Sequence, residues 1–162
     1  MASAAQVVAL LGGEKVVGKP VTCDLDIARL IGDGLPVDVI DTLIDDKTVT
    51  LDEVSRIIMP PKAVSERRRK GGLTPEQSDR VIRVARIFAE ALETFGSREK
   101  ALTWMRRTCS VLGGKTPIDL LDTEEGARLV ESLLGASLMV SPPDARLEAD
   151  TAAFRRSVRN GR

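Results

Sequence analysis

Five of the nine residues from position 62 to position 70 are basic, and they form the densest group of side chains with an obvious chemical use. Guanidinium and ammonium groups at this density bind phosphate oxygens, and arginine also recognises guanine edges in the major groove of DNA. Neighbouring residues of a helix point about 100° apart, so three consecutive arginines cannot all face one groove. The predicted DNA-binding residues are Lys62, Ser65, Arg67, Arg68, Arg69 and Lys70.

Within this set, we expect Lys62 and Ser65 to flank the surface that faces the groove, and two of the three arginines to contact phosphates. The chain as a whole carries 24 basic and 24 acidic residues, and residues 24–53 hold nine acids opposed by Arg29 and Lys47 alone. A net charge of zero does not exclude DNA, because attraction to phosphate is screened within about 10 Å and depends on local charge. The alternative is a solvated basic helix without a partner.

Residues suited to catalysis or metal binding are scarce. The chain has no His and no Tyr, which excludes a Ser-His-Asp nucleophile, an imidazole base and a His-ligated zinc. Cys23 and Cys109 lie far apart with no CxxC motif, so a structural zinc or redox pair is not expected. The Gly-Gly-Lys-Thr stretch at 113–116 lacks the first glycine of a phosphate-binding loop. We therefore expect a protein that is not an enzyme and needs neither a metal nor a cofactor.

The cysteines and the apolar segments indicate where in the cell the protein is expected. Two isolated thiols favour a reducing cytoplasm, although a disulfide between Cys23 and Cys109 stays open. No apolar run approaches the ~18 residues of a membrane span. The short apolar stretch near the N-terminus has no basic residues before it, which is not typical of a secretory signal. We expect a cytoplasmic protein with no membrane partner.

The basic segment follows directly after another predicted helix. Thr50 and Glu53 form a capping box that begins one helix. Pro60 and Pro61 must end it, because proline lacks the amide hydrogen and clashes with the preceding turn. The basic helix then runs to Lys70 and stops at two glycines. No segment alternates like a strand, so the predicted fold is all-α.

Helix signals continue through the second half of the chain. Thr74 begins another capping box, with proline at the first helical position, and predicts a long helix that ends at Gly96. We expect Asp79 and Arg80 to form ion pairs at i,i+4 spacing and not to take part in catalysis. Trp104 is expected in the core. Two further helices are expected to bury the following apolar residues: Leu25, Ala28, Leu30 and Ile31 in one, and Leu129, Val130, Leu133 and Leu134 in the other.

The segment from Leu73 to Gly135 carries a recognisable series of residues at fixed spacings: Leu73, Ser78, Asp79, Arg80, Phe95, Gly96, Ala101, Trp104, Gly114, Thr116, Pro117, Leu120, Leu121, Thr123, Gly126, Val130 and Leu134. In these residues the segment resembles the toxin-binding domain of the Xre/MbcA/ParS antitoxins, and the region upstream resembles the family's Xre-like helix-turn-helix. Two departures stand out: Ala63-Val64 replaces a Thr-Leu-like pair, and 27 residues follow Gly135 where family members commonly end sooner.

The resemblance implies an antitoxin whose partner is a RES-domain toxin, a class that consumes NAD or transfers ADP-ribose from it. It implies that the segment after the last helix occludes the NAD site. It also implies that the helix-turn-helix binds operator DNA of its own operon as a homodimer, and that the chain forms a hetero-oligomer with the toxin. The other function considered is a stand-alone helix-turn-helix regulator with a helical dimerisation domain.

The end of the last helix carries more apolar surface than a free helix end should expose, and such surface marks partner sites. Pro142-Pro143 then stiffens the chain, which lowers the entropy lost on binding. The predicted toxin-binding residues are Leu134, Ser137, Leu138, Met139 and Val140. The alternative is that Leu138 and Met139 fold back on the protein's own core. The expected division is 1–72 (N-terminal helical region with the helix-turn-helix motif), 73–140 (toxin-binding domain) and 141–162 (C-terminal tail).

Overall fold

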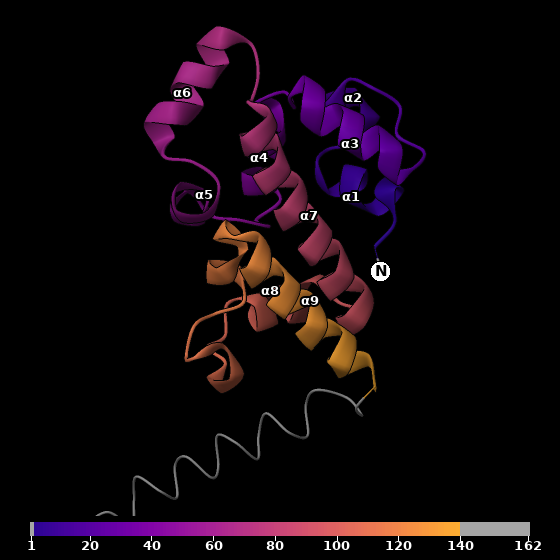
Figure 1. The fold of residues 1–162 in the computed structure, drawn as a ribbon, viewed down its shortest axis with the longest axis vertical. Helices are drawn as coiled ribbons and strands as arrows, with labels where there is room; N and C mark the ends of the chain where they lie inside the picture. Colours follow the sequence, from indigo (N-terminus) through magenta and orange to yellow (C-terminus); the bar gives the residue numbers. More distant parts are fainter. Residues whose placement is uncertain (1, 140–162) are drawn as a thin grey trace, which may run out of the picture.

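A computed structural model describes residues 2–139, with side chains as far as Ala136, and all regular structure in this range is helical (Figure 1). The prediction of an all-α fold is confirmed for this part of the chain. In chain order the elements are α1 (Ala4–Leu10), α2 (Glu14–Val17), α3 (Asp24–Asp33), α4 (Asp38–Asp45), α5 (Leu51–Ile57), α6 (Pro61–Lys70), α7 (Pro75–Phe95), α8 (Arg98–Met105), the 3-10 turns η1 (Ser110–Leu112) and η2 (Ile118–Asp122), and α9 (Glu124–Met139).

The long helix α7 is the centre of the fold. Helices α1 and α3 pack against it on one side, and α8 and α9 pack against it on the other (Figure 1). Apolar residues therefore cover most of its circumference, and one continuous hydrophobic core joins the two ends of the described chain. The buried residues of α7 are Ser78, Val81, Ile82, Val84, Ala85, Ile87, Phe88, Ala89 and Ala91.

The predicted helix boundaries are confirmed by their hydrogen bonds. The Thr50 hydroxyl accepts from the amide of Glu53 at 3.2 Å, and the Glu53 carboxylate accepts from the amide of Thr50 at 2.8 Å. Thr74 and Gln77 form the same reciprocal pair at 3.2 and 3.0 Å. Each cap of this kind contributes about 1 kcal/mol to helix stability. Helix α6 ends at Gly71, whose left-handed φ of 93° suits glycine.

Several predicted positions need correction. Leu25 is 58% exposed and Ala28 is exposed too, while Ile27 and Leu30 form the buried stripe of α3. Leu129 is 56% exposed, although its neighbour Val130 is buried as expected. Helices α3 and α9 each pack on α7 along a single side, so they bury a narrow stripe and leave apolar residues at its edge in water.

Trp104 lies at the edge of the core rather than inside it. The indole is half-buried, and its ring centre lies 5.5 Å from that of Phe95 at a tilt of 42°. This separation and tilt are typical of a favourable aromatic pair. The sequence reasoning also made no prediction for α1, which begins with a capping box between Ser3 and Gln6 and buries Val7 against the core.

Gly126 and Gly135 of α9 give a matched test of this packing. A Cβ atom at Gly126 would lie 2.0 Å from the backbone oxygen of Leu120 in η2, whereas one at Gly135 would meet nothing within 4 Å. We expect Gly126→Ala to lower the free energy of unfolding by about 2 kcal/mol, because η2 must shift. Gly135→Ala should raise it by up to about 1 kcal/mol through helix propensity. Urea denaturation measures both, and equal effects would contradict the packing of α9 on η2.

Candidate functional site

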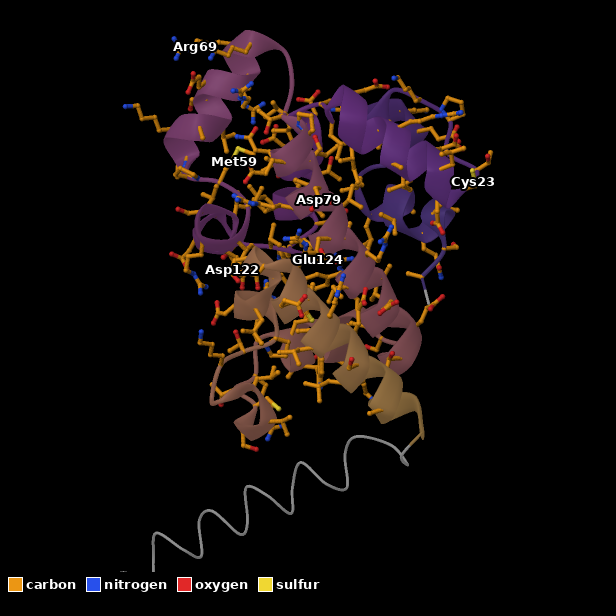
Figure 2. The ribbon with its side chains drawn as sticks, viewed as in Figure 1. Cys23, Met59, Arg69, Asp79, Asp122 and Glu124 are labelled. Carbon is orange, nitrogen blue, oxygen red and sulfur yellow. The ribbon has the colours of Figure 1, made fainter. Side chains whose placement is uncertain are left out.

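Helix α6 stands away from the body of the molecule (Figure 1). None of its residues is buried, and Ala63 and Val64 are partly covered where they pack against the core. Figure 2 shows Arg69 at the far end of this helix, pointing away from the protein. A projecting basic helix preceded by a short turn and a second helix, here α5, is the geometry with which helix-turn-helix proteins enter the major groove.

The predicted DNA-binding residues divide between two sides of α6. At 100° per residue, Lys62, Ser65 and Arg69 fall within one narrow sector, opposite the side that carries the core-packed Ala63 and Val64. All three are exposed, whereas Arg67 lies on the core side and is half-buried. The outward face of α6 therefore carries Lys62, Ser65 and Arg69, and the expected position of Lys62 and Ser65 beside a DNA groove stays a prediction.

Two of the other predicted residues already have acidic partners within the protein. The Arg68 guanidinium donates to both carboxylate oxygens of Asp41 in α4, at 2.6 and 2.7 Å, and Asp38 lies 3.8 Å away. The hydrogen bond and charge of Asp41 raise the pKa of Arg68. Lys70 pairs with Glu66 at 2.8 Å and lowers the pKa of that carboxyl. Arg68 and Lys70 are thus less available to a phosphate than Lys62 and Arg69, for which the described residues show no ion pair.

The Ser-Asp-Arg stretch at the start of α7 is occupied by structural contacts. Ser78 is buried, and its hydroxyl accepts from the amide of Leu35 at 2.8 Å. Arg80 donates to Glu76 at 2.7 Å and to the carbonyl oxygen of Ile58, in the turn before α6, at 3.0 Å. These contacts confirm that Asp79 and Arg80 belong to i,i+4 ion pairs rather than to a catalytic pair.

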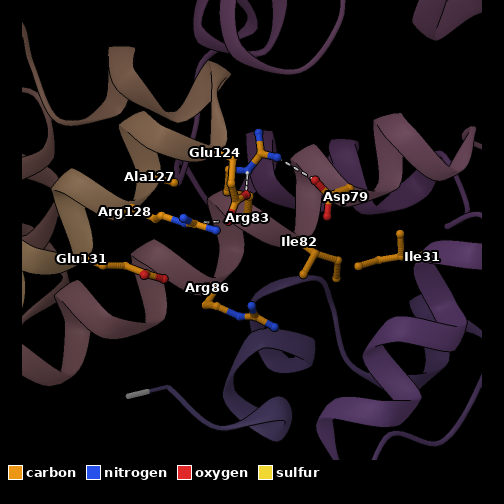
Figure 3. A pocket seen from close by; sticks show the side chains of 9 residues that line it. All are labelled: Ile31, Asp79, Ile82, Arg83, Arg86, Glu124, Ala127, Arg128 and Glu131. Atoms are coloured by element: carbon orange, nitrogen blue, oxygen red, sulfur yellow. Dashed lines mark hydrogen bonds and ion pairs between the residues drawn. The ribbon is translucent and has the colours of Figure 1, made fainter.

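A small cavity of about 110 Å³ lies between α3, α7 and α9 (Figure 3). On its wall, Arg83 is only 14% exposed and bridges Asp79 at 2.6 Å and Glu124 at 3.1 Å. The remaining polar walls carry further charges of both signs, including Arg86 and Glu131. No group of three potential metal ligands occurs among the described residues. The bridging arginine joins α7 to the start of α9.

The predicted toxin-binding residues begin near the end of α9, and the first of them, Leu134, is in the core. Leu134 is 2% exposed and packs with the buried face of α9, so it is not available to a partner. Its burial follows from helical spacing, because it lies one turn after Val130 on the same side. The helix continues through Gly135 to Met139. The side chains of Ser137, Leu138 and Met139, and the whole of Val140, lie outside the described residues.

A second apolar line on α9 was not predicted. Leu129 is exposed, Leu133 is half-buried and Ala136 is exposed, and their spacing places all three along one side of the helix. The line borders the buried stripe and leads toward the end of α9. The sequence does contain a signal for this line, because the apolar side chains of α9 cover a wider arc of the helix than packing on α7 requires. A helical wheel shows this difference.

Two further expectations concern the thiols and the membrane. Cys23 is exposed and Cys109 is half-buried, and both are free thiols, so the open possibility of a disulfide between them is resolved against it. From residue 2 to residue 139, no helix combines the length and apolar character needed to cross a membrane.

Two family profiles match the chain and together cover most of the described residues. The profile described as the antitoxin Xre-like helix-turn-helix domain matches residues 26–86, from α3 into α7, and includes α5, the turn and α6. The profile described as the antitoxin Xre/MbcA/ParS C-terminal toxin-binding domain matches residues 90–137, from the end of α7 into α9.

Curated relatives agree with these profiles. A protein named Antitoxin Xre from Photorhabdus laumondii is 33% identical over 124 residues, which cover 75% of this chain and 84% of the relative. Antitoxin Xre from Yersinia enterocolitica is 34% identical over 122 residues, covering 74% and 82%. The Prs ADP-ribosylating antitoxin of a Sphingobium species is 38% identical over 71 residues, covering 38% and 45%.

The long matches extend over both the helix-turn-helix region and the toxin-binding region, so they cannot reflect one shared motif. The helix order, the projecting basic helix and the helical C-terminal half agree with them. The chain therefore belongs to the Xre/MbcA/ParS family of type II antitoxins, which bind toxins and are not enzymes.

Proposed function

We propose that this antitoxin neutralises a RES-domain toxin by preventing NAD from reaching its active site. The observation that carries the proposal is the match of residues 90–137 to the toxin-binding domain of the family. The relative named Prs ADP-ribosylating antitoxin supports a toxin of this chemistry, because ADP-ribose groups come from NAD. We take residues 136–143, which lie beyond Leu134, the last buried residue among those that the structure describes, as the blocking segment.

The apolar line of Leu129, Leu133 and Ala136 supports a docking role for the same side of α9. Leucine and alanine at the edge of a packed helix leave apolar surface that a toxin can cover, with a gain of roughly 25 cal/mol per Å² buried. Docking along this line would direct the following residues, among them Ser137, Leu138, Met139 and Val140, toward the partner. Leu134 would act indirectly, by fixing α9 on the core.

Co-purification tests the proposal against the stand-alone regulator. The full chain is co-expressed with a tagged RES-type protein from the neighbouring reading frame, and the two are applied to a sizing column after affinity capture. We expect one hetero-oligomeric peak that contains both chains, and normal growth of cells that express both. A toxin that elutes alone and kills cells in the presence of the full chain would favour the stand-alone regulator.

We also propose that α6 binds operator DNA of the antitoxin's own operon, with two copies of the chain acting as a homodimer. The exposed face of Lys62, Ser65 and Arg69 supports this role, and the profile match over residues 26–86 names a helix-turn-helix domain. Two such helices in one complex would read half-sites about 34 Å apart, one turn of DNA. Such binding would repress transcription of the operon.

Asp41 is expected to weaken this DNA binding, since its carboxylate holds Arg68 and carries a negative charge beside α6. Asp41→Asn should raise the affinity for duplex DNA by about 2- to 5-fold at low salt, because it frees one guanidinium and removes one repulsive charge. Asp45→Asn is the matched control, since Asp45 lies in the same helix, is exposed and has no ion pair among the described residues. Fluorescence anisotropy measures both affinities, and equal gains would show that Arg68 is not restrained by Asp41.

A further inference from the structure

Helix α6 depends on its neighbours in sequence for its direction. It lacks extensive packing against any other helix of the described chain, and none of its residues is buried. The turn that precedes it is firmly held, because Ile57, Ile58 and Met59 are all buried. Arg80 of α7 also donates to the carbonyl oxygen of Ile58. The direction of α6 is therefore set by α5 and the turn, together with the contacts of Ala63 and Val64 with the core and the ion pair between Arg68 and Asp41.

Helix α5 is in turn held by a residue from the toxin-binding half. Glu53 is only 5% exposed, and its carboxylate accepts from Arg106 at 2.8 Å (Nε) and 2.9 Å (Nη2). The same carboxylate closes the capping box on Thr50. Arg106 follows the last residue of α8, and it also donates to the carbonyl oxygen of Thr48 at 3.3 Å. The hydrogen bonds that Arg106 donates to the Glu53 carboxylate raise the pKa of this guanidinium.

Two more side chains from beyond residue 90 hold the same region. Asp119 of η2 pairs with Arg56 on α5, and α5 packs along η2. At the start of α8, Arg98 donates to the Thr48 hydroxyl at 2.7 Å and to the carbonyl oxygen of Asp46. The α4–α5 loop and α5 are thus fixed by three side chains that lie within the range of the toxin-binding profile.

We infer that Arg106, assisted by Asp119, is a positioning residue for DNA recognition, so the DNA-binding unit extends into the toxin-binding half. This inference rests on the proposed binding of operator DNA by α6. Removing Arg106 would leave the buried carboxylate of Glu53 without its counter-charge, and α5 would have to move to expose it. Contacts to base edges require an accurately placed helix, whereas non-specific attraction to phosphates depends mainly on charge.

The test uses the full chain and two DNA duplexes: the segment directly upstream of the chain's own reading frame, and a shuffled duplex of the same composition. Arg106→Gln is compared with Arg107→Gln, which removes the same charge from the adjacent exposed residue, for which no ion pair is described. We expect Arg106→Gln to bind the upstream duplex about 10-fold more weakly, with its affinity for the shuffled duplex unchanged within about 2-fold and an unchanged salt slope. Arg107→Gln should match the wild type, and Arg106→Lys should be intermediate.

Circular dichroism measures the helix content of each variant, and so it shows whether weaker DNA binding comes from a displaced α6 or from an unfolded chain. If Arg106→Gln unfolds, Asp119→Asn decides the matter, and we expect about 3-fold weaker binding of the upstream duplex alone. The inference is overturned if Arg106→Gln is folded and binds both duplexes as Arg107→Gln does. It is also overturned if Arg106→Gln is unfolded and Asp119→Asn binds the upstream duplex as tightly as the wild type. In either case the proposed DNA binding by α6 still stands. A wild-type chain that binds both duplexes equally overturns the proposed DNA function and the inference with it.

Discussion

Replacing Lys62 and Arg69 with glutamine together is expected to weaken DNA binding by at least about 10-fold and to lower the salt slope by about 2. Both side chains lie on the exposed face of α6, away from the side that packs on the core. Each phosphate contact that is lost removes one released counterion, which is why the affinity and its salt dependence should fall together. Titrations of an operator duplex at several salt concentrations measure both quantities.

The matched control lies in the same helix. Arg67→Gln with Arg68→Gln removes the same net charge, but Arg67 is on the core side and Arg68 is held by Asp41. We expect this second pair of substitutions to change the affinity by less than about 3-fold. Equal losses for the two double variants would show that bulk charge alone drives binding. An unchanged affinity in the first variant would show that α6 does not contact DNA.

Deleting every residue after Gly135 is expected to abolish neutralisation while leaving the fold intact. Leu134 is the last buried residue of the described chain, and Gly135 and Ala136 are exposed, so the deletion removes no described core contact. The apolar line of α9 would keep Leu129 and Leu133 but lose Ala136. We expect the shortened chain to melt within about 5 °C of the full chain, because small surface changes affect stability little, and no longer to protect toxin-expressing cells.

A second deletion, after Asp144, is the control for this experiment. It removes the basic tail that begins at Ala145 and keeps residues 136–143. Cells that carry this chain should still grow. Protection by the chain that ends at Gly135 would show that the domain surface inhibits the toxin by itself, and loss of protection in both would assign the effect to the tail.

Helix boundaries were predictable from the sequence because local chemistry decides them. The capping boxes at Thr50 and Thr74, the proline break at Pro60 and Pro61, and the stop at Gly71 each depend on residues within one turn. The all-α fold follows from the same signals. Which apolar residues are buried was less predictable, because Leu25 and Leu129 depend on how far α3 and α9 rotate against α7.

Ion pairs within one helix were predictable, but the partners of other charged residues were not, because they come from distant parts of the chain. The basic segment was recognised as a group, yet the pairing of Arg68 with Asp41 and of Arg106 with Glu53 needed the tertiary structure. For the same reason, Leu134 was assigned to a partner surface although it packs in the core. Arg106 has no local signal of its role, since the sequence around it resembles any exposed basic turn.

The division into folding units at residues 72 and 73, and at residues 140 and 141, stays a prediction. Helix α7 is covered by α1 and α3 on one side and by α8 and α9 on the other, so a fragment that begins at residue 73 would expose apolar surface of α7 to water. The helix-turn-helix profile also runs into α7, as far as residue 86. Both observations favour one cooperative unit over residues 2–139.

The rate of NAD consumption by the purified RES-type toxin, measured while the full chain is titrated into it, tests the central claim most directly. The account predicts that the rate falls to background once the antitoxin saturates the toxin, and that the chain ending at Gly135 binds but leaves the rate high. A toxin that consumes NAD at its full rate while saturated with the full chain would contradict the account.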